Sequence, residues 1–182
     1  MTQPDIGNPE SSTVGISGKS ASSVARSRLR RATLGMIVGL MIQFAAGMLV
    51  NLFTNIPDSH PGSNPSDYFS GSLQGVIWAT AQSGLPALVF HTAWGLLLVV
   101  NGVVLIALAR SVGRRAVTVS AILGFLFVLG AAFNGASFLD FNEDYSSMIM
   151  ATLFGLSVLA YSVVLFLLPA RDHLGEVLRR DL

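Results

Sequence analysis

The sequence contains no cysteine and few charged residues. The absence of cysteine excludes disulfide bonds, thiolate metal sites and cysteine nucleophiles. Charged residues make up 12% of the 182 residues, which is about half of the roughly 25% that soluble domains carry. Hydrophobic residues make up 52%. This composition argues against a water-soluble globular fold and favours an integral membrane protein.

The apolar residues form four long stretches that contain no Asp, Glu, Lys or Arg. A helix needs about 20 apolar residues to cross a bilayer, and the stretches that meet this requirement are 33–53, 86–108, 117–139 and 148–168. Pro86 suits the first turn of a helix, and Pro169 cannot continue one. The sequence therefore predicts an all-α membrane protein with four antiparallel transmembrane helices, in a domain over residues 32–169 that contacts the lipid bilayer.

Basic residues are missing from the connections 54–85 and 140–147. All 11 Lys and Arg lie instead within 19–31, 110–115 and 171–180. Cytoplasmic loops carry the excess of Lys and Arg in membrane proteins, so we expect both termini in the cytoplasm and the other two connections outside. Membrane orientation accounts for these basic residues, and we therefore expect no nucleic-acid partner.

The remaining segments are polar or too short to cross a membrane. Residues 1–31 are rich in Ser, Gly, Thr and Pro, and we predict a disordered cytoplasmic tail because they cannot bury enough apolar surface. Residues 170–182 form a second cytoplasmic tail, either an interfacial helix or a frayed terminus. The weaker apolar patch 73–81 predicts an interfacial or re-entrant helix.

Glycines in the predicted spans mark helix–helix contacts, because small residues let helices approach closely in lipid. A pair spaced as Gly35 and Gly39 is compatible with a homodimer, but packing inside the monomer is the favoured interpretation. Gln43 lies near mid-membrane, so its amide should find a partner on another helix. The candidate packing positions are Gly35, Gly39, Gly47, Gly95 and Gly102.

His91 is the only histidine within a predicted span. Ionisable residues in membranes are candidates for functional sites, although a neutral histidine bonded to a neighbouring helix is a common structural outcome. When the spans are laid antiparallel, several polar side chains fall at similar depth. We therefore predict an outward-facing polar pocket in which His91 approaches Asn134 or Thr152. Its candidate lining residues are His91, Asn134, Asn51, Thr152, Gln43 and Tyr145.

Acidic residues and a histidine in the outer connections are weak candidates for a metal site. Carboxylate and imidazole groups suit hard or borderline metal ions. The spacing matches no known metal-binding motif, and a rigid turn shaped by prolines is the simpler interpretation of the first connection. The candidate ligands are Asp58, His60, Asp140, Glu143 and Asp144.

Two short motifs, Gln43-x-x-x-Gly47 and His91-x-x-x-Gly95, resemble the half-bundle of haem A synthase and similar small bacterial four-span membrane proteins. The resemblance implies a bacterial cell membrane and a b-type haem held between histidines on facing helices. Met148 and Met150 stand where the second histidine would be expected. Haem b is therefore a disfavoured cofactor.

No nucleotide-binding loop, zinc-protease motif or catalytic triad is recognisable, so an enzyme is the less favoured interpretation. The leading hypothesis is a multi-pass membrane protein that acts as an accessory subunit of a larger complex or binds a small ligand in the outer pocket. One alternative is a redox protein that binds haem b or quinone through His91. The other is a channel or transporter component formed by homo-oligomerisation around the first span.

Overall fold

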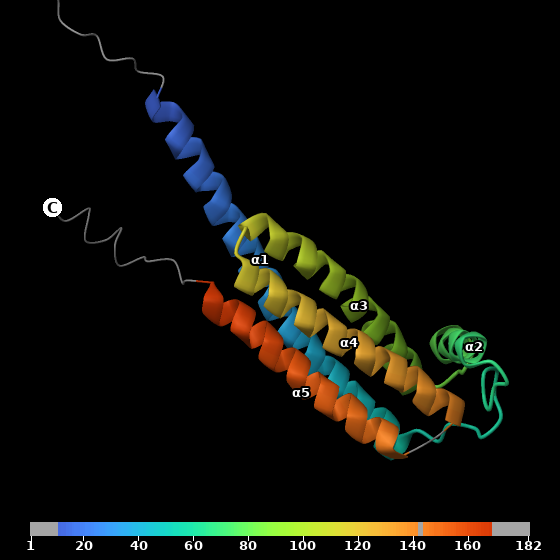
Figure 1. The fold of residues 1–182 in the computed structure, drawn as a ribbon. Helices are drawn as coiled ribbons and strands as arrows, with labels where there is room; N and C mark the ends of the chain where they lie inside the picture. Colours follow the sequence, from blue (N-terminus) through green and yellow to red (C-terminus); the bar gives the residue numbers. More distant parts are fainter. Residues whose placement is uncertain (1–10, 142–143, 169–182) are drawn as a thin grey trace, which may run out of the picture.

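The computed structural model describes residues 11–141 and 144–168, and over these residues the regular structure is entirely helical. Four long helices run side by side, and one short helix lies across an end of the bundle (Figure 1). This arrangement confirms the predicted all-α architecture with four spans. The helices are α1 (Ser11–Phe53), α2 (Tyr68–Ala81), α3 (Pro86–Val112), α4 (Arg115–Phe141) and α5 (Asp144–Leu167).

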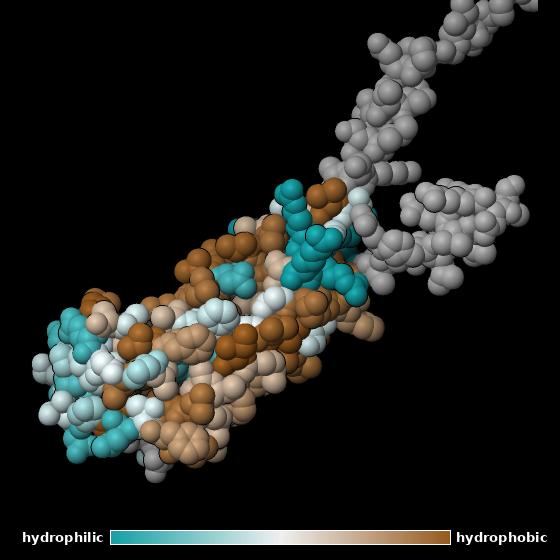
Figure 2. All heavy atoms as spheres, turned by 180° about the vertical axis from the view of Figure 1, so that it is seen from behind, coloured by the Kyte–Doolittle hydropathy of each residue, from teal (hydrophilic) through white to brown (hydrophobic). Residues whose placement is uncertain are grey.

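All four long helices are long and apolar enough to cross a membrane, over Ser23–Phe53, Pro86–Val112, Arg115–Phe141 and Tyr145–Leu167. Large apolar side chains point away from the bundle, among them Val100, Leu159 and Phe166, which is 88% exposed. Figure 2 shows this apolar surface along the middle of the molecule, with hydrophilic residues towards both ends. Such a band is the surface expected of a multi-pass membrane protein.

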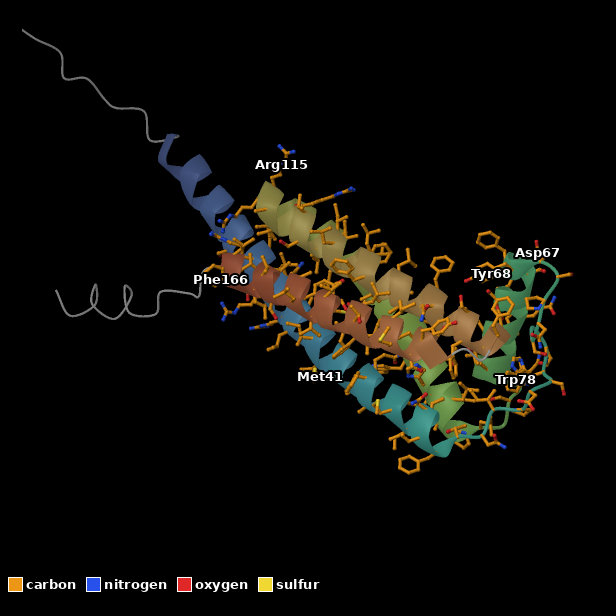
Figure 3. All side chains as sticks on the ribbon, turned by 60° about the horizontal axis from the view of Figure 1, so that its bottom comes forward. Met41, Asp67, Tyr68, Trp78, Arg115 and Phe166 are labelled. Atoms are coloured by element: carbon orange, nitrogen blue, oxygen red, sulfur yellow. The ribbon has the colours of Figure 1, made fainter. Side chains whose placement is uncertain are left out.

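The two ends of the bundle differ in charge. Figure 3 shows Arg115 and Phe166 at one end, which we call the basic end. Asp67, Tyr68 and Trp78 lie at the other, which we call the acidic end. The basic end holds the tight turn between α3 and α4, where the N–H of Gly113 donates to Arg110 O (3.0 Å) with a φ of 72°. A glycine suits this left-handed conformation, which ends α3 and reverses the chain.

Helix α1 begins at Ser11, within the segment for which we predicted a cytoplasmic tail. Residues 11–31, which we predicted to be disordered, are helical. Leu29 and Thr33 of this helix are fully buried in the bundle. The rest of the predicted N-terminal tail and the whole of the predicted tail 170–182 lie outside the described residues.

Arginines cap the end of α5 at the basic end. The last carbonyls of a helix have no partner within the helix and carry the negative end of its dipole. Arg30 Nη1 donates to Leu168 O (3.5 Å), and Arg114 Nη1 donates to Leu167 O. These contacts join α1, at Arg30, and the α3–α4 turn to α5.

Helix α2 covers the acidic end and includes the patch 73–81, for which the sequence predicted an interfacial or re-entrant helix. The backbone N–H of Ser70 donates to Asp67 Oδ1 (2.8 Å), and this hydrogen bond caps the helix and lowers the pKa of the exposed Asp67 carboxyl. Trp78 is buried on the inner face of α2, and the Tyr68 hydroxyl lies 2.6 Å from Ser137 Oγ of α4. The patch is therefore helical and is packed onto the ends of α3 and α4.

Tyr161 of α5 is at the centre of the core in the basic half of the bundle. Its ring is fully buried and lies over Gly124, where a Cβ atom would come within 2.8 Å of Tyr161 Cζ. The Tyr161 hydroxyl has no hydrogen-bond partner. The side chain therefore contributes through packing, while its hydroxyl carries a desolvation cost.

We expect Tyr161→Phe to stabilise the protein by about 1–3 kcal/mol, the usual cost of an unpaired buried polar group. Thermal unfolding in mild detergent measures the change. Tyr145→Phe is the matched control, because Tyr145 is 62% exposed and should respond little. A loss of stability in Tyr161→Phe would show that the hydroxyl has a stabilising partner and would contradict this account.

Candidate functional site

A cavity of about 230 Å³ lies between α1, α3, α4 and α5, in the half of the bundle nearer the acidic end. We call it the membrane cavity. Leu, Val, Ala, Met and Phe side chains form most of its wall, which is typical of a site for a small apolar molecule. The polar side chains that line it are Gln43, Asn51, His91, Thr92, Ser147 and Ser157.

Gln43 of α1 and His91 of α3 meet in this cavity, with 3.4 Å between Gln43 Nε2 and His91 Nε2. Each side chain lies over a glycine of the opposite helix. A Cβ atom at Gly47 would be 2.9 Å from His91 Cε1, and one at Gly95 would be 2.9 Å from Gln43 Nε2. The motifs Gln-x-x-x-Gly and His-x-x-x-Gly are therefore complementary, because each supplies a side chain and the space for its partner.

The orientation of the Gln43 amide decides which nitrogen of the neutral His91 ring carries the proton. In the orientation of the structure the amide nitrogen faces the ring and donates, so His91 Nε2 accepts and the proton lies on Nδ1. Both His91 Nδ1 and Gln43 Oε1 are buried without a partner. The pair therefore presents one unused donor and one unused acceptor.

Gln43 has a partner on another helix, and that partner is His91. His91 pairs with Gln43 rather than with Asn134 or Thr152. Asn134 Nδ2 donates to Ser146 O (2.5 Å), and Thr152 Oγ1 donates to Met148 O (2.9 Å). Backbone carbonyls of α5 thus satisfy both side chains, and neither residue lines the membrane cavity.

Of the other two predicted pocket residues, Asn51 lines the membrane cavity and Tyr145 does not. Asn51 lines the membrane cavity, and its Oδ1 accepts a hydrogen bond from Ser147 Oγ (3.3 Å). Tyr145 is largely exposed and does not line the cavity. Met150 lines it, whereas Met148 is 68% exposed. Of the two methionines considered for haem, Met150 is thus the one that lines the same cavity as His91.

The predicted packing glycines lie mainly inside the bundle. The Cβ position at Gly39 is 2.7 Å from Leu98 Cδ2, and at Gly102 it is 2.7 Å from Phe125 Cδ2. At Gly35 the same position has no neighbour within 4 Å. Close packing at Gly39 favours the interpretation of monomer packing over a dimer through both glycines.

Sequence analysis missed Trp94 as a determinant of the site. The indole Nε1 of Trp94 donates to Gly39 O (2.9 Å) and so ties α3 to α1 one turn away from the Gln43–His91 pair. Its position three residues after His91 was an available signal, since residues at this spacing share a helix face. Ser147 was missed because its role depends on the contact with Asn51.

The metal-ligand candidates lie at the acidic end, away from the Gln43–His91 pair. Asp58, His60 and Asp140 line a second cavity of about 120 Å³. Glu143 and the side chain of Asp144 lie outside the described part of the chain. Within the described ranges, no three His, Asp or Glu side chains converge as a metal-binding group.

The complementary packing can be tested with Gly47→Ala and His91→Ala. Gly47→Ala alone should destabilise the protein by about 1–3 kcal/mol, because the added Cβ displaces the imidazole. In the double variant the ring is gone, so the two effects should fall short of their sum by about 1 kcal/mol or more. Chemical unfolding in detergent measures all four proteins. Additive effects would mean that Gly47 does not accommodate His91.

No family profile, curated protein or solved structure matches this chain. The fold and the Gln43–His91 pair therefore bring no function through relationship to another protein. What remains is the chemistry of the membrane cavity, with its apolar walls and its unused donor and acceptor.

Proposed function

We propose that this multi-pass membrane protein binds a small, uncharged and mainly apolar molecule in the membrane cavity. Its role would be that of a non-enzymatic ligand-binding protein, acting alone or as an accessory subunit of a larger membrane complex. The cavity supports this proposal because apolar walls with a few convergent polar groups are the usual composition of a small-molecule site.

The observation that carries the proposal is the unused hydrogen-bonding capacity of His91 and Gln43. An unpaired buried polar group costs about 1–3 kcal/mol, and His91 Nδ1 and Gln43 Oε1 are two such groups at one site. A ligand recovers this cost if it offers an acceptor to Nδ1–H and a donor to Oε1. Hydroxyl and carbonyl groups on an apolar skeleton have this chemistry.

Quinone binding is a second candidate, favoured by the proton on His91 Nδ1. A quinone carbonyl would accept from Nδ1–H but would leave Gln43 Oε1 unpaired. The reduced quinol also donates, and it would satisfy both residues. The site chemistry therefore favours the quinol over the quinone. Identification of the bound molecule would distinguish quinone binding from binding of another hydroxylated apolar molecule.

The charge distribution supports an orientation in which the membrane cavity belongs to the outer half of the bilayer. The cavity lies nearer the acidic end, and all Lys and Arg of the sequence lie in the segments assigned to the other side. The positive-inside rule places such segments in the cytoplasm. The ligand would then enter from the outer leaflet or from outside the cell.

Ligand retention tests the proposed function. Wild type, His91→Leu and Thr152→Val are purified in mild detergent, and the small molecules extracted from each are quantified by mass spectrometry. We expect wild type and Thr152→Val to retain the same molecule and His91→Leu to retain at least about tenfold less, equivalent to about 1.4 kcal/mol. Thr152 is the control because it lies outside the cavity.

Melting temperatures of the three proteins establish that each is folded before extraction. Equal retention in His91→Leu and wild type would contradict a role for His91 in binding. No retained molecule in wild type, together with no stabilisation by added quinol or by a hydroxylated apolar lipid, would overturn the proposed function.

Orientation is tested separately with single cysteines, since the chain has no cysteine of its own. A membrane-impermeant maleimide should label Ser66→Cys in intact cells and leave Ser111→Cys unlabelled until the cells are opened. Both positions are exposed in the structure, so access to the side chain is equal. The reverse pattern would invert the proposed orientation.

A further inference from the structure

We propose that the ligand of the membrane cavity is a single-chain membrane lipid with a hydroxyl head, whose chain leaves the cavity sideways between α1 and α5. This inference rests on the proposed function and adds the class of ligand and its route. The cavity is closed at both ends of the bundle, reaches the surface between these two helices and is too small for a whole lipid. Its polar pair also suits a hydroxyl group.

Apolar side chains close the membrane cavity at both ends. Towards the acidic end, its wall belongs to a buried apolar cluster, through Val50, Leu88 and Leu139. Towards the basic end, its wall belongs to the main core of the bundle, through Leu40 and Leu98. In the described part of the chain, both paths along the bundle axis are therefore filled, and a ligand has to enter from the side.

Two of the four sides are closed by contacts between neighbouring helices. Gln43 and His91 fill the space between α1 and α3. Between α4 and α5, Met150 lies over Gly135, where a Cβ atom would come within 3.3 Å of Met150 Sδ. The sides that remain lie between α3 and α4 and between α1 and α5.

Two contacts join α1 to α5 along the cavity, and they lie about 10 Å apart at the helical rise of roughly 1.5 Å per residue. Phe44 stacks on Phe154 with 4.8 Å between ring centroids. Nearer the acidic end, Ser147 Oγ donates to Asn51 Oδ1 (3.3 Å). All four residues line the cavity, so the two contacts mark the limits of an opening between these helices.

The space between the two contacts, which we call the side window, is bordered by Met48 and Ala151. Both residues line the cavity, and both are exposed on the surface of the bundle. Ala151 carries only a methyl group, and Met48 has an unbranched side chain that adapts its shape easily. Both lie within helices able to span a membrane, so the side window faces lipid rather than water.

The side between α3 and α4 is less accessible than the side window. Leu96 and Ala132 line the cavity there and are exposed. However, α2 packs on α3 and α4 (Figure 1), and its Val76 forms part of the cavity wall. Within the described residues, α2 makes no such contact with α1 or α5. The side window is therefore the exit that α2 leaves uncovered.

The volume of the cavity limits how much of a ligand it can hold. Its 230 Å³ lies below the range of about 300–1,000 Å³ for pockets that enclose drug-sized ligands. It is room for about eight waters at roughly 30 Å³ each. The head and the first few carbons of a lipid chain fit this space. The rest of the chain would pass through the side window and stay in the bilayer.

A hydroxyl head suits the Gln43–His91 pair because a hydroxyl group both donates and accepts. His91 Nδ1 and Gln43 Oε1 are buried without a partner. The match holds in either orientation of the Gln43 amide, because turning the amide exchanges donor and acceptor on both side chains. A charged head is excluded by its desolvation cost, since the cavity lining contains no Asp, Glu, Lys or Arg.

Photolabelling tests the route. Full-length protein is placed in phosphatidylcholine nanodiscs with hexadecanol that carries a diazirine in the middle of its chain. Mass spectrometry should find label near Met48 and Ala151, and excess unlabelled hexadecanol should remove it. In His91→Leu this label should fall at least about tenfold. Label at Leu159 and Phe166, which are exposed in the other half of the bundle, should stay the same.

Ala151→Phe and Thr152→Phe form the matched pair for ligand size. Both residues are exposed on α5, but Ala151 lines the cavity and Thr152 does not. Ala151→Phe should bind tritiated hexadecanol at least about tenfold more weakly than wild type, because the added ring fills the side window. It should bind tritiated hexanol, which fits inside the cavity, as wild type does. Thr152→Phe should bind both alcohols as wild type does.

Competable label at Leu96 and Ala132 in place of the side window would overturn the route, and so would unchanged binding of hexadecanol by Ala151→Phe. If Ala151→Phe also loses hexanol, its ring fills the cavity itself, and the photolabel in wild type decides. Wild-type protein that binds hexanol but not hexadecanol would refute the lipid class and leave the proposed function standing. Wild type that binds neither alcohol refutes this inference, while ligand retention decides the proposed function separately.

Discussion

The contact on which the membrane cavity depends is the reciprocal packing of α1 and α3. His91 occupies the space left by Gly47, and Gln43 occupies the space left by Gly95. A lipid environment gives no hydrophobic drive for helix association, so close packing and interhelical hydrogen bonds have to supply it. This pair supplies both, and Trp94 adds a hydrogen bond to Gly39 O one turn along α1. The same contact holds two polar groups at the cavity wall with part of their capacity unused.

The four spans were predictable from the sequence because a bilayer imposes a strong and simple requirement. Any predominantly apolar stretch of about 20 residues with few or no charges is a candidate, and each of the four such stretches lies in a long helix. The upstream part of α1 was not predictable by this rule. Residues 11–31 carry Ser and Arg rather than a long apolar run, although Leu29 within them is fully buried.

The candidate site was only partly predictable. The sequence gives the depth of a residue in the membrane, but it does not give the direction in which the side chain points around the helix axis. Helix direction and residue number placed His91, Asn134 and Thr152 at similar depth, but the rotation of each helix about its axis was unknown. In the structure, Asn134 and Thr152 bond to backbone carbonyls of α5 and leave His91 to Gln43. A better signal was the equal spacing of Gln43–Gly47 and His91–Gly95, since two antiparallel helices with a large and a small residue four apart can fit each other in one register.

The two arginines that cap α5 have a consequence for how the chain is assembled during synthesis. Arg30 lies in α1 and Arg114 lies between α3 and α4, yet both donate to carbonyls at the end of the fourth span. Membrane segments leave the ribosome in order, from the N-terminus. Until α5 has been inserted, both guanidinium groups must therefore find their partners among lipid headgroups and water. Closure of the basic end is thus a late event, and it exchanges lipid contacts for protein contacts only when all four spans are in the membrane.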